Sequence, residues 1–176
     1  LESGQFVKAT WKSRLPEQVG TWQLDLMKPL PWLVLDSPTL LNATNTATNL
    51  AYDNLPEREP QPELFEHLSQ LLTNFNSPHW PRYYLAYEQA LLSACGYGLS
   101  LQHCGVTKQK HDLIYISPKT GSAISKECGE PYKDKLFTWL ALLADPLNLE
   151  HSLEELEEAS RISSWFVSKF LYDPRG

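Results

Sequence analysis

The sequence predicts an α+β fold, in which a helical bundle carries an inserted zinc-ribbon-like β knuckle and follows an N-terminal hairpin. Three observations predict it. Apolar and polar residues alternate over residues 5–26, the apolar spacing becomes helical beyond Pro38, and two short Cys-containing motifs flank a turn near residue 119. Each predicted element follows from its own local pattern.

The first predicted element is a β-hairpin over residues 5–26. In its first strand Val7, Ala9 and Trp11 fall on one face, and Lys8 and Lys12 fall on the other. The second strand repeats the alternation, with apolar residues at three alternate positions: Trp22, Leu24 and Leu26. Because a lone hairpin is marginally stable in water, we expect it either to pair with strands that lie upstream of Leu1, which the missing initiator Met makes credible, or to lie on the helical body that follows.

Helical spacing dominates from Pro38 onward. We expect a helix over residues 40–52 and a second that begins at Pro62, a residue suited to the first turn of a helix. The apolar stripe of the second helix contains Leu64, Phe65, Leu68, Leu71, Leu72 and Phe75. Pro78 and Pro81 are expected to break the chain before a third helix, which begins near Trp80.

The third predicted helix ends where Gly96 and Gly98 interrupt the pattern. Leucines in residues 136–143 indicate a helical turn or two. Ser152 and Glu155 have the spacing of a capping box, which predicts the start of a last helix that continues to Phe170.

The knuckle lies in residues 99–131. A strand over 113–117, a turn over 118–121 and a return strand over 122–125 form a second hairpin. Cys104-x₂-Thr107 precedes it and Ser125-x₂-Cys128 follows it, with 17 residues between Thr107 and Ser125. With cysteine at all four positions this would be zinc-ribbon spacing.

Two thiols are too few for a structural zinc site, because hydroxyls are poor zinc ligands. We therefore expect a metal-free knuckle and no cofactor, with Cys104 and Cys128 as the degenerate remains of a site. Bound zinc completed by His103 or His111 is the alternative. A thiol enzyme built on Cys104 is a remote hypothesis that requires a lowered pKa of that thiol, and neighbouring His103 would point to the opposite face of a strand.

Composition narrows the class of protein. The chain has 176 residues, a net charge of −6 and 42% hydrophobic residues, which is typical of a globular protein. No apolar run reaches the length of a membrane span, and three scattered cysteines argue against a disulfide-rich secreted scaffold. Residues 104–140 carry six lysines against four acids, so a polyanion would prefer this segment to the acidic residues 145–173.

A family resemblance rests on the knuckle and its flanks. Residues 83–98 (YYLAYEQALLSACGYG), the Cys104-x₂-Thr107 motif, residues 115–121 (YISPKTG) and residues 129–132 (GEPY) resemble the RecO family in its alphaproteobacterial form. Residues 11–15 (WKSRL) and Gly20-Thr21 resemble the last hairpin of that family's N-terminal OB-fold domain. The resemblance implies residues 1–30 as the end of an OB-fold, residues 31–176 as the helical domain, and truncation at both ends.

The resemblance also implies a function. RecO proteins are DNA-binding recombination mediators, without enzymatic activity, in DNA repair. They bind single- and double-stranded DNA, anneal complementary strands, contact the single-strand-binding protein and act with RecR to load RecA. For this chain we therefore expect a cytoplasmic, nucleoid-associated protein with no membrane contact. A protein-interaction adaptor that does not touch DNA is the alternative.

The candidate DNA-binding residues are cations and one aromatic residue that could stack on bases. They are Lys8, Trp11, Lys12, Arg14, Lys108, Lys110, Lys119 and Lys126. For each of them a structural explanation stands beside the functional one. Trp11 shares the apolar face of its strand and could belong to a barrel core, and the lysines could be ordinary solvated residues.

Overall fold

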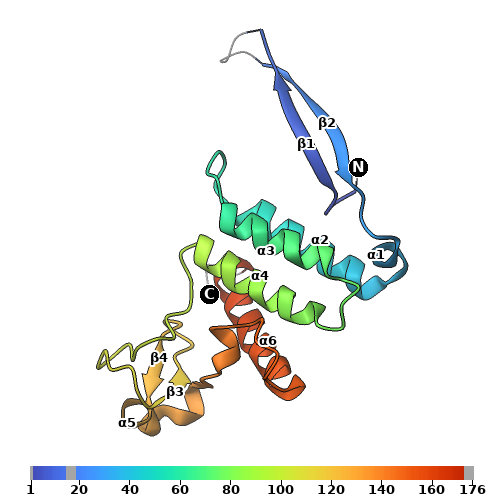
Figure 1. The fold of residues 1–176 in the computed structure, drawn as a ribbon. Coiled ribbons are helices and arrows are strands. Elements are labelled where there is room, and N and C mark those ends of the chain that lie inside the picture. The colour runs from blue at the N-terminus through green and yellow to red at the C-terminus, as the bar shows by residue number, and fades with distance from the viewer. Residues whose placement is uncertain (1, 15–18, 173–176) are drawn as a thin grey trace. The chain divides into compact units, whose positions relative to one another are not determined.

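The structure is a computed structural model, and it describes residues 2–14 and 19–172. The chain divides into two compact units, Leu1–Asn49 and Leu50–Gly176 (Figure 1). Each unit is described by itself. Mixed helices and small antiparallel sheets confirm the α+β class, whereas the assignments to an OB-fold and a zinc ribbon stay predictions.

The first unit begins with the predicted hairpin. Strand β1 (Phe6–Lys12) pairs antiparallel with β2 (Thr21–Lys28), and the register places Val7 opposite Leu26 and Trp11 opposite Trp22. The alternation read from the sequence therefore puts the apolar residues of both strands on one face. Leu15, part of the predicted turn and of the resemblance, lies outside the described residues.

Two helices follow the hairpin. A short helix α1 (Trp32–Asp36), which the sequence did not predict, buries Val34. Helix α2 (Pro38–Asn54) confirms the helix expected over residues 40–52 and begins in the first unit and ends in the second. Its threonines do not break it, because the Thr44 and Thr48 hydroxyls donate to carbonyls one turn earlier.

The second unit is built around three helices. Helix α3 (Pro62–Thr73) packs against α4 (Trp80–Ala94), and α4 packs against α6 (Leu153–Val167) (Figure 1). Their shared core consists of fully buried aliphatic and aromatic side chains, among them Leu71, Leu85, Tyr87, Leu91, Leu92, Ile162 and Phe166. The capping box expected at the start of α6 is present, with the Ser152 hydroxyl accepting from the Glu155 N–H.

Two details of these helices differ from the sequence prediction. Phe65 was expected in the apolar stripe of α3 but is 63% exposed, because the buried face runs through Leu64, Leu71 and Leu72. Pro81 was expected to break the chain. It lies instead in the first turn of α4, where proline leaves no intrahelical hydrogen bond unmade.

The two strands of the knuckle and one strand that follows it form a three-stranded sheet in the order β4-β3-β5. Strand β3 (Leu113–Ile116) pairs antiparallel with β4 (Ala123–Ser125), which confirms the predicted hairpin, and with β5 (Phe137–Thr138). Helix α5 (Lys126–Gly129) follows β4 directly. The Tyr115 ring approaches Gly129 so closely that a Cβ atom would collide with it, which explains glycine at that position.

Short turns of helix complete the second unit. The 3₁₀ helix η1 (Glu130–Lys135) precedes β5, and η2 (Ala141–Leu143) follows it. The helical turns expected over residues 136–143 are therefore only partly present, since Phe137 and Thr138 pair with β3 instead. After α6 the chain continues as a π-helix, η3 (Ser168–Tyr172).

Candidate nucleic-acid interface

The predicted basic residues of the hairpin are exposed. Lys8 and Lys12 lie on the face of the hairpin opposite to the one that carries Trp11. In the register of the two strands Lys8 lies opposite Asp25, and the Lys12 ammonium donates a hydrogen bond to the Gln23 side chain. Trp11 lies on the other face, where its ring contacts Trp22 at 5.0 Å between centroids. Since strand side chains alternate, Trp11 and the two lysines cannot serve one binding surface together.

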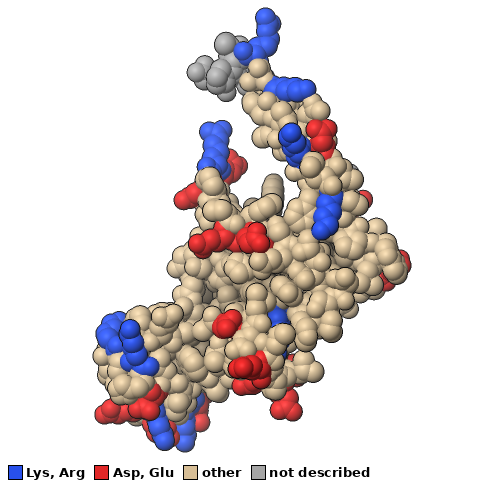
Figure 2. All heavy atoms as spheres, viewed as in Figure 1, with Lys and Arg blue, Asp and Glu red and all other residues tan. Residues whose placement is uncertain are grey.

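The apolar face of the hairpin is exposed within the described residues. Val7, Trp11, Trp22, Leu24 and Leu26 each keep more than a third of their side-chain surface accessible. Arg14 is also exposed, immediately beyond β1. Figure 2 shows basic side chains spaced along this hairpin with few acidic ones between them.

The knuckle lysines divide between the two ends of the β3–β4 hairpin. Lys119 lies in the turn that joins the strands. Lys126 begins α5 at the opposite end, where its N–H donates to the Asp112 carbonyl at 2.8 Å. Lys108 and Lys110 lie in the loop that leads to Asp112, so they belong with Lys126 and not with Lys119. All four side chains are exposed.

Cys104 sits in a pocket of hydrogen-bond donors formed by both knuckles. Its thiol is fully buried, and the Ser125 N–H donates to Sγ at 3.4 Å. Burial raises the pKa of the Cys104 thiol, but hydrogen bonds from Thr107 and Ser125 outweigh it and lower the pKa to about 6. The Ser125 hydroxyl is buried without a well-aligned partner in the described part of the chain, yet it lies close enough to Sγ to add to this effect.

The donor atoms do not fit a zinc ion. Thr107 and Ser125 stand where a zinc ribbon has thiolates, and in this structure they serve as hydrogen-bond donors to Cys104. The His111 ring nitrogen lies 3.0 Å from the Asp112 carboxylate. Across residues 2–14 and 19–172, no three His, Cys, Asp or Glu side chains gather closely enough to hold a metal ion.

The lowered pKa of Cys104 meets one requirement of a thiol enzyme, but the surroundings of the sulfur do not meet the others. The thiol is closed off from solvent, and its partners are a backbone N–H and hydroxyls, with no imidazole among the contacts described. A nucleophile needs an adjacent base and access to its substrate. The arrangement of Cys104 is that of a structural thiol.

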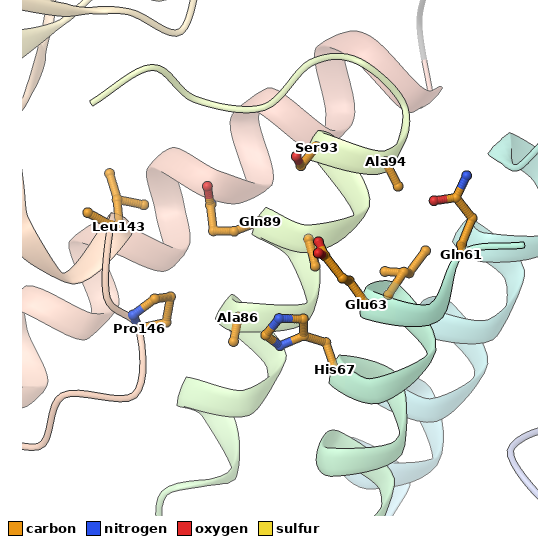
Figure 3. A pocket seen from close by; sticks show the side chains of 12 residues that line it. Gln61, Glu63, His67, Ala86, Gln89, Ser93, Ala94, Leu143 and Pro146 are labelled. Carbon is orange, nitrogen blue, oxygen red and sulfur yellow. The ribbon is translucent and has the colours of Figure 1, made fainter. Parts of the chain in front are cut away.

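A hollow of about 550 Å³ lies between α3 and α4 in the second unit. Figure 3 shows Glu63 and His67 of α3 on one side of it, Gln89 and Ser93 of α4 on another, and Leu143 and Pro146 across from them. Its charged lining residue is Glu63, and neither lysine nor arginine contributes. The hollow therefore offers an acidic peptide no lysine or arginine to pair with, and His67 is the basic side chain in its lining.

A family model described as "Recombination protein O C terminal" matches residues 37–175. Curated relatives match almost the whole chain. A protein of Rickettsia canadensis is 35% identical over 171 residues, which cover 97% of this chain and 70% of the relative. The chain belongs to the RecO family.

Other RecO relatives agree. Proteins of a Caulobacter and a Chelativorans species are each 34% identical, with 99% and 100% of this chain covered and 72% and 71% of the relatives. All three relatives are named DNA repair protein RecO. No solved structure matches the chain. The resemblance inferred from the knuckle and its flanks, including its alphaproteobacterial character, is thereby confirmed.

No helix within the described ranges combines the length and the apolar composition that a bilayer span requires.

Proposed function

We propose that this chain acts in DNA repair as a recombination mediator that binds DNA and carries out no covalent chemistry. The observation that carries the proposal is membership of the RecO family over nearly the whole chain. In this role it binds single- and double-stranded DNA, anneals complementary strands, and acts with RecR to load RecA onto strands coated by the single-strand-binding protein.

The exposed cations support contact with phosphates. Lys8, Lys12 and Arg14 form no ion pair with a carboxylate in the part of the chain that the structure describes, and the same holds for Lys108 and Lys110. Unpaired surface cations can release counterions from DNA when they bind it. The absence of an enzymatic role is supported by the burial of Cys104, a thiol whose pKa is lowered.

Strand annealing tests the proposal. Two complementary fluorescent oligonucleotides should pair faster in the presence of the protein than without it, and the protein should retard each strand in a gel. A variant with Lys8, Lys12 and Arg14 changed to alanine should bind DNA several-fold more weakly, because each lost phosphate contact removes part of the electrostatic attraction. Lys133→Ala is the matched control, since Lys133 already pairs with Glu130 at 3.4 Å.

The exposed apolar face of the hairpin favours a second function, a protein-interaction adaptor. Trp22, Leu24 and Leu26 are 47 to 60% exposed, and contiguous exposed apolar surface marks sites of protein–protein contact. If the triple alanine variant keeps full DNA affinity, or if the intact protein neither binds nor anneals DNA, the adaptor becomes the better description.

A further inference from the structure

Three aromatic rings form a near-parallel stack that runs from the core of the second unit to its surface. The Phe166 and Phe170 rings are 6.0 Å apart with planes at 15°, and the Phe170 and Tyr97 rings are 4.7 Å apart with planes at 5°. Phe166 is fully buried, whereas Tyr97 is 42% exposed. The stack thus ends on a tyrosine whose outer face meets no other ring of the described residues.

Tyr97 is held in place by the end of α4. Gly96 has φ +83°, a conformation that glycine adopts without strain, and its N–H donates to the Ser93 carbonyl at 3.0 Å. The Tyr97 N–H donates to the Leu92 carbonyl at 2.7 Å. These two bonds form a Schellman motif, so the backbone that presents the ring is fixed before any ligand arrives.

Cations lie beside the stack. The Lys169 ammonium stands 5.1 Å from the centre of Phe170 and 4.8 Å from the centre of Trp165, which is 36% exposed. It donates one hydrogen bond to the Pro118 carbonyl at 2.9 Å and keeps two further N–H groups. The bond to Pro118 also brings the turn that contains exposed Lys119 next to η3.

These cations are free to attract an anion. Among residues 2–14 and 19–172, no carboxylate forms an ion pair with Lys169 or Lys119. Arg161, two turns earlier on α6, is different. It makes bonds of 2.6 and 2.8 Å to both oxygens of Glu158, so its charge is already matched.

We propose that Tyr97 is a stacking platform for an unpaired base of single-stranded DNA, with Lys169 beside the next ring of the stack and Lys119 in the turn that Lys169 contacts. A base laid on Tyr97 would extend the existing stack, and its flanking phosphates would meet the two ammonium groups. This combination of an exposed ring and neighbouring cations is the one that single-strand-binding surfaces use. The proposal rests on the DNA binding proposed above and names a site for it on the helical unit. Duplex DNA does not fit, because its bases are already stacked.

The test compares two oligonucleotides of equal charge. Fluorescence anisotropy measures the affinity of the protein for a 20-nucleotide poly-dT strand, whose bases stack little on one another, and for a strand of the same length made of abasic sites. The ratio of the two affinities isolates base stacking from phosphate attraction. Tyr97→Ala and Tyr97→Leu remove the ring, and the leucine keeps apolar packing on Phe170. Tyr97→Phe keeps the ring, and Tyr52→Ala is the control, since Tyr52 is an exposed tyrosine outside the stack.

The platform predicts that Tyr97→Ala and Tyr97→Leu bind poly-dT about tenfold more weakly and bind abasic DNA with almost unchanged affinity. Tyr97→Phe and Tyr52→Ala should match the unmodified protein, and Lys169→Gln should weaken binding of both strands. An unchanged affinity ratio in Tyr97→Leu would overturn the platform while leaving DNA binding intact. Failure of the unmodified protein to bind either strand would instead reject the proposed function on which the platform rests.

Discussion

Glu88 gives the sharpest prediction of pH-dependent stability. This α4 carboxylate is 4% exposed and is met by hydroxyls of α6, with Ser163 donating at 2.6 Å and Ser164 at 3.5 Å. Burial raises the pKa of Glu88 from 4.5 to about 7, although the serine hydrogen bonds oppose the rise. At a pH between these two values, the folded protein therefore keeps a proton on Glu88 that the unfolded chain has already released.

The sign of the effect follows from proton linkage. Between pH 4.5 and about 7 the folded state binds more protons than the unfolded state, so the free energy of unfolding falls as pH rises. The difference between the folded and unfolded pKa values of Glu88 corresponds to a loss of about 3 kcal/mol in the free energy of unfolding. This loss is complete once the pH exceeds the pKa of the folded state. Glu88→Gln carries no charge at any pH and should escape this loss.

Urea unfolding of both proteins at pH 5, 6, 7 and 8 measures the effect. We expect the stability of Glu88→Gln relative to the unmodified protein to increase by about 2 to 3 kcal/mol from pH 5 to pH 8. Glu157→Gln is the control, because it removes a charge at an exposed position of α6. Its stability relative to the unmodified protein should change little between pH 5 and pH 8. If the difference for Glu88→Gln is the same at pH 5 and pH 8, the ionisation of Glu88 does not limit stability and the reasoning is refuted.

Three further predictions concern stability. Arg82 is buried and donates to the carbonyls of Asn148 and His151 at 2.7 and 2.6 Å. Arg82→Leu should therefore lower the free energy of unfolding, measured in urea, by about 2 to 4 kcal/mol, and a loss below about 1 kcal/mol would contradict this. Ser152→Ala removes the capping box of α6 and should cost about 1 kcal/mol in the same assay, whereas an unchanged midpoint would show that the cap is dispensable. The pKa of Cys104 is lowered from 9 to about 6 in the folded protein. The unmodified protein should therefore gain stability relative to Cys104→Ser as the pH rises from 6 to 9, and a stability difference that stays flat or shrinks would count against a buried thiolate.

Local patterns predicted the secondary structure well. The alternation around Trp11 predicted the first hairpin, the Pro62 position predicted the start of α3, and the spacing of Ser152 to Glu155 predicted the cap of α6. Each of these depends on residues only a few positions apart. The short helix α1 was missed because five residues carry too little periodicity to be recognised.

Long-range partners could not be read from the sequence. Arg82 and Glu88 look like surface charges on a helix, but both are buried and form hydrogen bonds with groups 66 to 76 positions away. The convergence of Thr107 and Ser125 on Cys104 was suggested by knuckle spacing, but the resulting fall in its pKa depends on geometry. Tyr97 was noticed only as part of a family motif, since its stacking partner Phe170 comes from η3.

Both proposals for this chain require that it holds DNA through its phosphates. The most direct test is the affinity of the intact protein for a single-stranded oligonucleotide, measured at NaCl concentrations from 50 to 300 mM. We expect a straight fall of log affinity with log salt, with a slope of about −0.7 for each phosphate contacted. Binding that is absent at the lowest salt, or that does not change with salt, would contradict it.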